Sequence, residues 1–137
     1  MSGAGSSCGV GVPRTRLAAM VVGGGGGERL GGVSKPDLVF GGVRLVDRVC
    51  CALGEVTGAG VVAIVPPSVR VPTGVTRALE DPPGGGPLAG IDAGLAALSV
   101  GADCWVIVVS VDCPGIADIL SCLLAEPLGI ACDGRIL

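Results

Sequence analysis

The stretch from Met20 to Pro36 reads MVVGGGGGERLGGVSKP, and the predicted fold is arranged around it. An apolar run from Leu17 to Val22 enters the glycines directly, as a buried strand of an open α/β sheet enters a loop at its carboxyl end. Glycines leave backbone N–H groups uncovered and permit positive φ, so a polyphosphate can approach the main chain. Arg29 and Lys35 add fixed positive charge. The pattern predicts an anion-binding loop.

Two common phosphate-binding loops do not match this stretch. The Walker pattern requires glycine directly before the lysine and Ser or Thr after it, whereas Lys35 stands between Ser34 and Pro36. The dinucleotide fingerprint fails because residues 28–30 occupy the place of its last glycine or alanine. A flexible glycine linker followed by a chance basic residue is the competing interpretation. The ordered spacing of the arginine, the later glycine pair and the lysine favours the phosphate loop.

Residues 22–35 resemble a known signature, Leu-Ala-Gly-Gly-x-(Gly/Ser)-x-Arg-x-Gly-Gly-x-Asp-Lys, found in MobA-type molybdenum cofactor guanylyltransferases. Val22 and Gly23 depart from it conservatively, and Ser34 stands where the family usually has aspartate. The resemblance implies nucleotide contacts for one set of residues and catalytic roles for another. The implied nucleotide-binding residues here are Val22, Gly23, Gly24, Gly25 and Lys35, and the implied catalytic residues are Lys35 and Arg29.

The composition excludes several classes of protein. A length of 137 residues suits one domain with a real core, and the 50% hydrophobic content with a mean hydropathy of +0.77 argues against disorder despite 26 glycines and 10 prolines. A net charge of −3, with Phe40 and Trp105 as the aromatic residues, gives neither a basic surface nor a stacking platform. We therefore expect no nucleic-acid partner.

The absence of histidine removes imidazole as a base, a nucleophile or a zinc ligand. Metal chemistry then falls to carboxylates, which favours a hard ion such as Mg²⁺. The cysteines include no Cys-x-x-Cys pair, their number is odd, and most lie in apolar runs, which favours buried reduced thiols over a disulfide framework or a metal cluster. They are Cys8, Cys50, Cys51, Cys104, Cys113, Cys122 and Cys132.

The amino-terminal residues 1–16 are rich in glycine and serine and are expected to form a flexible segment. Few apolar residues follow before the glycine run, too few for the core of a signal peptide and far too few to span a bilayer. The sequence therefore predicts a cytoplasmic protein that has no membrane partner.

Apolar patterning predicts an α/β fold with a mainly parallel sheet covered by helices on both faces. The charge-free run at 104–111 is expected to lie in the middle of that sheet. Gly54 is placed to stop the first helix, and Leu88, Ile91, Leu95 and Leu98 are expected on one face of the second. The predicted strands are 17–22, 61–65, 75–79, 104–111 and 128–132, and the predicted helices are 43–53, 88–98 and 116–125.

Two carboxylates follow predicted strands at the same edge as the glycine loop. Asp81 could be a solvated turn residue and Asp112 a helix cap. However, residues 80–90, with Glu-Asp, a glycine-rich turn and Gly-Pro-Leu-Ala-Gly, resemble the guanylyltransferase family a second time. The Asp-x-Pro at 112–114 resembles the family's metal-binding turn. The resemblance implies that Asp81 binds the nucleotide and that Asp112 is a catalytic ligand of Mg²⁺.

The resemblance implies a three-layer α/β/α Rossmann-like nucleotidyltransferase domain, of the nucleotide-diphospho-sugar transferase type, over residues 17–137 and without the carboxyl-terminal portion of its relatives. The implied reaction transfers GMP from GTP to molybdenum-molybdopterin and releases pyrophosphate. Three alternatives remain open: a non-catalytic or truncated nucleotide-binding module, a related transferase that uses CTP or a sugar-phosphate acceptor, and a poorly folding fragment. The sequence makes no prediction of the oligomeric state.

Overall fold

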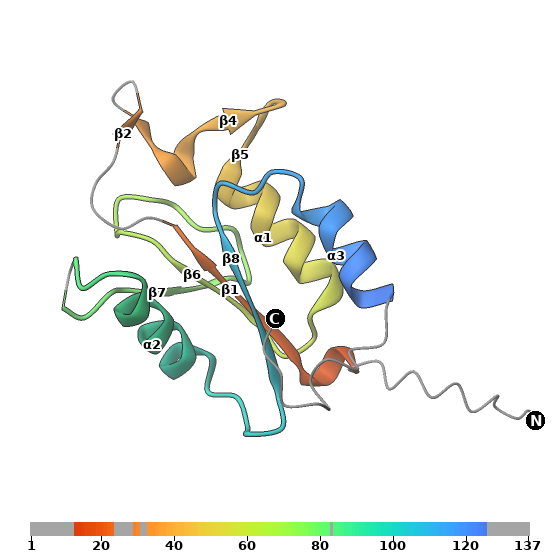
Figure 1. Cartoon of the computed structure of the whole chain (residues 1–137). Helices are drawn as coiled ribbons and strands as arrows, with labels where there is room; N and C mark the ends of the chain where they lie inside the picture. The colour runs from red at the N-terminus through yellow and green to blue at the C-terminus, as the bar shows by residue number, and fades with distance from the viewer. Residues whose placement is uncertain (1–12, 24–28, 31–32, 83, 126–137) are drawn as a thin grey trace, which may run out of the picture.

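The computed structural model describes residues 13–23, 29–30, 33–82 and 84–125, and within them the chain forms an α/β fold of three layers (Figure 1). A four-stranded parallel sheet has the order β7-β6-β1-β8. Helices α1 and α3 cover one face and α2 covers the other. These elements are β1 (Leu17–Val22), α1 (Leu45–Val56), β6 (Val61–Ile64), β7 (Thr76–Ala78), α2 (Pro87–Leu98), β8 (Trp105–Ser110) and α3 (Ile116–Ala125). The predicted fold class is confirmed.

Strand β1 lies at the centre of the sheet because its run of apolar side chains is buried on both faces. It pairs in parallel with β6 on one side, where Val22 is opposite Ile64. On the other side it pairs with β8, where Val22 is opposite Ser110. Both neighbours therefore end beside the residue that enters the glycine loop, which places three strand ends at one edge.

Strand β8 occupies the edge of the sheet within the described residues, so the prediction that this run lies in the middle is wrong for that part of the chain. Val109 is buried on the face that α1 and α3 cover. Helix α2 packs mainly over β6, β7 and β1, which leaves Val108 47% exposed on the opposite face of β8. Trp105 at the start of the strand is 44% exposed. The predicted strand 128–132 lies outside the described residues.

Helix α1 continues past Gly54, so the predicted stop at this glycine is wrong. The helix ends at Val56, where Thr57 caps it: the Thr57 hydroxyl donates a hydrogen bond of 2.8 Å to the carbonyl of Leu53. Gly54 is exposed and has open space around it, which explains why the helix tolerates it. The buried face consists of Leu45, Val46, Val49, Cys50 and Leu53, which recur at helical spacing within the predicted helix 43–53.

Helix α2 contacts the sheet through two glycines and through part of the predicted apolar face, since Ile91 and Leu98 pack against the core. Gly90 and Gly94 are buried, whereas Leu88 is 80% exposed and Leu95 is also exposed. A Cβ atom on Gly94 would lie 3.0 Å from Ile64 Cδ1 and 3.1 Å from Met20 Cε, so the small residue lets the helix approach the sheet closely. Apolar periodicity cannot predict that Gly90 and Gly94 face the sheet, because glycine has no side chain that would contribute to an apolar pattern.

Short elements fill the connection from the glycine loop to α1 and lie at the upper edge of Figure 1. They are the strand pair β2 (Arg29–Leu30) and β3 (Val33–Ser34), the 3-10 turn η2 (Lys35–Asp37), and the strand pair β4 (Val39–Phe40) and β5 (Val43–Arg44). Gly41 and Gly42 connect β4 to β5 with φ values of +61° and +81°, a conformation that favours glycine. A further 3-10 turn, η1 (Arg14–Arg16), precedes β1.

The cysteines in the described ranges are all free, but most of them are not buried, so that part of the prediction is wrong. Cys50 is buried in α1, and burial raises the pKa of its thiol to about 12. Cys51 and Cys122 are exposed because they lie on the outer faces of α1 and α3. No helix in the described ranges combines the length and apolar character needed to cross a membrane.

Candidate active site at the carboxyl edge of the sheet

The start of the glycine loop is packed between neighbouring strand ends. The Gly23 N–H donates a hydrogen bond of 2.9 Å to the Ile64 carbonyl, and the Val22 carbonyl accepts one of 3.0 Å from the Val111 N–H. A Cβ atom on Gly23 would lie 2.2 Å from Val65 Cγ1, a contact that no side chain can make without movement of its neighbours. Glycine is therefore required at this position by packing.

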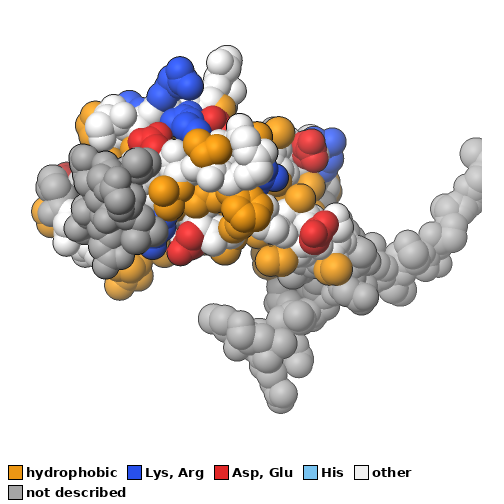
Figure 2. Space-filling view, turned by 90° about the horizontal axis from the view of Figure 1, so that it is seen from above, with side chains coloured by type: hydrophobic (Ala, Val, Ile, Leu, Met, Phe, Trp, Pro, Cys, Tyr) orange, Lys and Arg blue, Asp and Glu red, His pale blue; other side chains and the backbone are white. Residues whose placement is uncertain are grey.

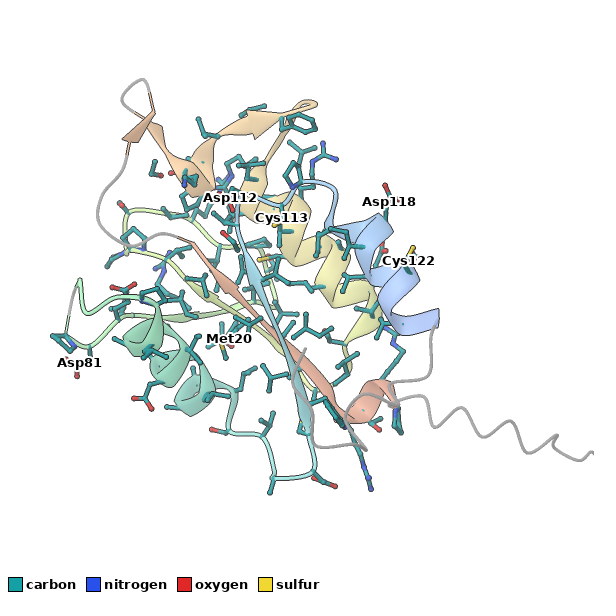
Figure 3. The ribbon with its side chains drawn as sticks, in the orientation of Figure 1. Met20, Asp81, Asp112, Cys113, Asp118 and Cys122 are labelled. Atoms are coloured by element: carbon teal, nitrogen blue, oxygen red, sulfur yellow. The ribbon has the colours of Figure 1, made fainter. Side chains whose placement is uncertain are left out.

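Lys35 and Asp112 meet above the ends of β1 and β8. The Lys35 ammonium lies 3.6 Å from Asp112 Oδ2, and the two side chains are 31% and 50% exposed. Lys35 is the only lysine in the chain, and it begins the turn η2. Asp112 lies two residues after the end of β8 (Figure 3). An ion pair this exposed contributes little to stability, so it leaves both groups available to a ligand.

The Asp112 carboxylate also accepts a hydrogen bond from the Ser110 hydroxyl. This hydrogen bond, followed by the positive charge of Lys35, lowers the pKa of Asp112 below its ordinary value. The group is therefore ionised at neutral pH. A carboxylate in this state can bind a hard cation or exchange its lysine partner for one.

Arg44 connects the turn η2 (Lys35–Asp37), the lysine turn, to α1. Sequence reasoning did not select this arginine. Its guanidinium donates a bond of 2.7 Å to Asp37 Oδ1 and two bonds of 2.8 Å to the Asp47 carboxylate. Asp37 in turn accepts a hydrogen bond of 2.7 Å from the Ser34 hydroxyl. The Arg44–Asp47 spacing at the start of a predicted helix was an available signal. The contact between Asp37 and Arg44 had no such signal, because it forms only when the β4–β5 pair folds the chain back.

Arg48 holds the β4–β5 pair against α1. Its Nη2 donates a hydrogen bond of 2.7 Å to the Phe40 carbonyl, and its guanidinium lies 5.5 Å from the centroid of the Phe40 ring. Two arginines, Arg44 directly before α1 and Arg48 in its first turn, therefore fix the segment that follows Lys35.

The other sequence-predicted residues are placed differently. Asp81 is exposed in the loop between β7 and α2, and Figure 3 shows it well separated from Asp112. The backbone of Arg29 pairs with that of Ser34 in the β2–β3 pair, one residue before Lys35. Gly24 and Gly25 lie outside the described residues. The structure thus brings together the lysine, the Asp112 carboxylate and Gly23, but not Asp81.

The surface seen from above mixes charges rather than separating them. Figure 2 shows basic and acidic side chains interspersed with apolar ones over this face, without an extended patch of one sign.

The single carboxylate of Asp112 suits a Mg²⁺ ion that is bound together with a nucleotide. No group of three or more candidate metal ligands occurs in the part of the chain that the structure describes. Mg²⁺ is usually held in nucleotide sites by one or two carboxylates together with substrate phosphates and water. One ionised, half-exposed carboxylate matches an ion that arrives with a nucleotide, and it does not match a permanent all-protein cage.

Comparison with protein families decides the relationship. A family model described as the MobA-like NTP transferase domain matches residues 19–131, which contain Gly23, Lys35 and Asp112. The chain belongs to the MobA-like NTP transferase family. No curated protein and no solved structure gave a significant match. Membership of the MobA-like NTP transferase family supports a nucleotidyltransferase activity, which uses a nucleoside triphosphate and, in general, a divalent metal ion.

Proposed function

We propose that this MobA-like NTP transferase transfers GMP from GTP to the terminal phosphate of molybdenum-molybdopterin and releases pyrophosphate. The observation that carries the proposal is the 3.6 Å pair between the Lys35 ammonium and the Asp112 carboxylate, next to the first glycine of the loop. A cation for phosphate oxygens and an anion for a metal ion are the two charges that triphosphate binding needs side by side. The cytoplasmic location expected from the sequence remains a prediction.

The reaction requires charge neutralisation more than base catalysis. An oxygen of the acceptor phosphate attacks the α-phosphorus of GTP, the bond to the bridging β-phosphate oxygen breaks, and pyrophosphate leaves with the electron pair. The attacking oxygen is already anionic, so the lack of histidine is no obstacle. Lys35 would stabilise the charge that develops on the departing pyrophosphate, together with the backbone N–H groups of the glycine loop and Arg29.

Asp112 would hold Mg²⁺ in this scheme. When bound, Mg²⁺ would supply positive charge that offsets the negative charge of the phosphates. The lowered pKa keeps Asp112 ionised for that role. Because Lys35 already lies beside the carboxylate, binding of the metal–nucleotide complex would let the ammonium exchange the carboxylate for a phosphate oxygen without a large movement. Asp81 would contact the nucleotide from the β7–α2 loop.

The direct test is release of pyrophosphate from each of the four nucleoside triphosphates with Mg²⁺, with and without molybdenum-molybdopterin. The proposal predicts release that requires the molybdenum cofactor and is fastest with GTP. Preference for CTP, or release that depends on a sugar phosphate, would indicate the related transferases instead. Calorimetric binding of GTP without any pyrophosphate release would indicate a nucleotide-binding module and contradict the transferase assignment.

A further inference from the structure

The turn that carries Lys35 is closed by a contact between its two ends. The hydroxyl of Ser34, which precedes Lys35, donates a 2.7 Å hydrogen bond to Oδ2 of Asp37, which lies after it. The intervening residue, Pro36, is buried and lies close to Gly23, so the turn also rests on the end of β1. Lys35 is therefore the exposed member of a short, internally bonded segment.

Arg44 attaches this turn to the helix behind it. It is only 17% exposed, and it binds Asp37 with one nitrogen while it holds both oxygens of Asp47. It also donates a 2.8 Å hydrogen bond to the Arg70 carbonyl. A planar guanidinium with several partners fixes geometry more strongly than a single flexible ion pair does.

We propose that Asp37 is a positioning residue for Lys35: held between Ser34 and Arg44, its carboxylate sets the turn that directs the lysine toward Asp112. The inference rests on the proposed nucleotidyl transfer. The loop signature that this stretch resembles has an aspartate where the chain has Ser34. The hydrogen bond from Ser34 to Asp37 means that a carboxylate is still present at this turn, moved to the other side of Lys35.

The kinetic test compares Asp37→Ala and the isosteric Asp37→Asn with the exchange variant Ser34→Asp/Asp37→Ser. Loss of the carboxylate is expected to lower kcat about tenfold and to change the KM for GTP less than about threefold, because a misplaced charge acts mainly on the transition state. The exchange variant, which keeps one carboxylate and one hydroxyl around Lys35, is expected to recover most of kcat. No recovery, or an unchanged kcat in both single variants, would overturn the proposal.

A matched control removes an arginine–carboxylate ion pair at the amino ends of the parallel strands, opposite the candidate site. Asp103 lies 3.4 Å from Arg16 before β8, far along the strand from Asp112. Asp103→Ala is expected to leave kcat within about twofold of the starting protein, because an exposed pair contributes little to stability. An equal loss of kcat in Asp103→Ala and Asp37→Ala would mean that both act through general stability, and it would overturn the positioning role.

A second readout does not depend on activity. Because Lys35 is the only lysine, a chain labelled with ¹³C-lysine gives one side-chain signal, and its relaxation reports the mobility of that side chain. Asp37→Asn is expected to raise this mobility, and the exchange variant is expected to restore it. If the protein released no pyrophosphate, the proposed function would fail, while unchanged lysine relaxation in Asp37→Asn would separately overturn the positioning role.

Discussion

The lysine turn and the β7–α2 loop both carry residues that the sequence assigned to nucleotide binding, but they differ in how firmly they are held. The lysine turn is bonded internally, tied to α1 through Arg44, and placed beside Asp112. The β7–α2 loop is mostly exposed, and its described residues form a 3.1 Å hydrogen bond from the Gly84 N–H to Glu80 Oε2 and a 2.9 Å bond from the Gly85 N–H to the Pro82 carbonyl, but neither of these ties it to a helix. Asp81 is exposed at its tip.

This difference separates two kinds of contribution to a transferase. A charge that must meet the developing transition state is useful only when its position is set in advance. A group that contacts the nucleotide away from the reacting phosphates can adjust on binding, and it then affects affinity more than rate. The contrast predicts that changes in the lysine turn act on kcat and that changes in the β7–α2 loop act on KM.

The largest effect is expected from removal of either charge in the pair. Lys35→Ala and Asp112→Ala should each lower the rate of pyrophosphate release by about 10² or more, because one charged contact in the transition state contributes a few kcal/mol. Steady-state assays with GTP measure this directly. The control is Asp118→Ala, since Asp118 is exposed on α3 and lies apart from Asp112 in Figure 3. A rate close to that of the starting protein in either pair variant would refute the assignment.

The packing beneath the lysine turn is expected to tolerate no added atom at Gly23. Gly23→Ala places a Cβ 2.2 Å from Val65 Cγ1 and 3.3 Å from Pro36 Cγ, and it should lower the free energy of unfolding by about 1–3 kcal/mol. Urea denaturation measures the change. Gly54→Ala is the matched control: it lies in α1 with open space around it, and it should raise stability by about 0.5–1 kcal/mol. Equal effects at the two glycines would contradict the packing argument.

A smaller effect is expected in the β7–α2 loop. Asp81→Ala should raise the KM for GTP by about fivefold, which corresponds to the loss of one exposed hydrogen bond of about 1 kcal/mol. Its kcat should stay within about twofold, in contrast with the lysine-turn variants. The same kinetic assay measures both values. A loss of kcat comparable to that of Lys35→Ala would remove the distinction between the two segments.

The smallest effect concerns ionisation of Asp112. Ser110→Ala should raise the pKa of Asp112 toward the ordinary 3.8, because the hydroxyl is the largest cause of its lowering. A lowered pKa in the folded state means that the associated stability is fully present above pH 3.8 and is lost as pH falls through the lowered value. NMR titration of the carboxyl carbon measures the midpoint. A midpoint that does not move would show that Ser110 is not the cause.

Much of the fold could be predicted because apolar runs bounded by glycine, proline and aspartate mark buried parallel strands. The meeting of Lys35 and Asp112 was predictable for the same reason, since the carboxyl ends of parallel strands share one edge of the sheet. That edge geometry needs no knowledge of side-chain contacts. The prediction therefore extended to the nearness of Lys35 and Asp112, while their roles in binding and catalysis stay predictions.

Other features could not be predicted because they depend on tertiary arrangement. The Asp37–Arg44 contact requires the Gly41–Gly42 turn to fold the chain back, so no local pattern indicates it. The sheet-facing side of α2 includes the buried Gly90 and Gly94, which carry no apolar signal. The edge position of β8 among the described residues depends on pairing between strands far apart in the sequence, which no local pattern indicates.

The measurement that tests the central claim most directly is protection of Lys35 from acylation. Because the chain has one lysine, acetic anhydride modifies the Lys35 amine and the amino-terminal amine as its two amines, and mass spectrometry quantifies each. If a triphosphate binds between Lys35 and Asp112, saturating GTP with Mg²⁺ should slow modification of Lys35 by about tenfold or more while the amino-terminal amine reacts as before. Equal modification of Lys35 with and without the nucleotide would contradict this account.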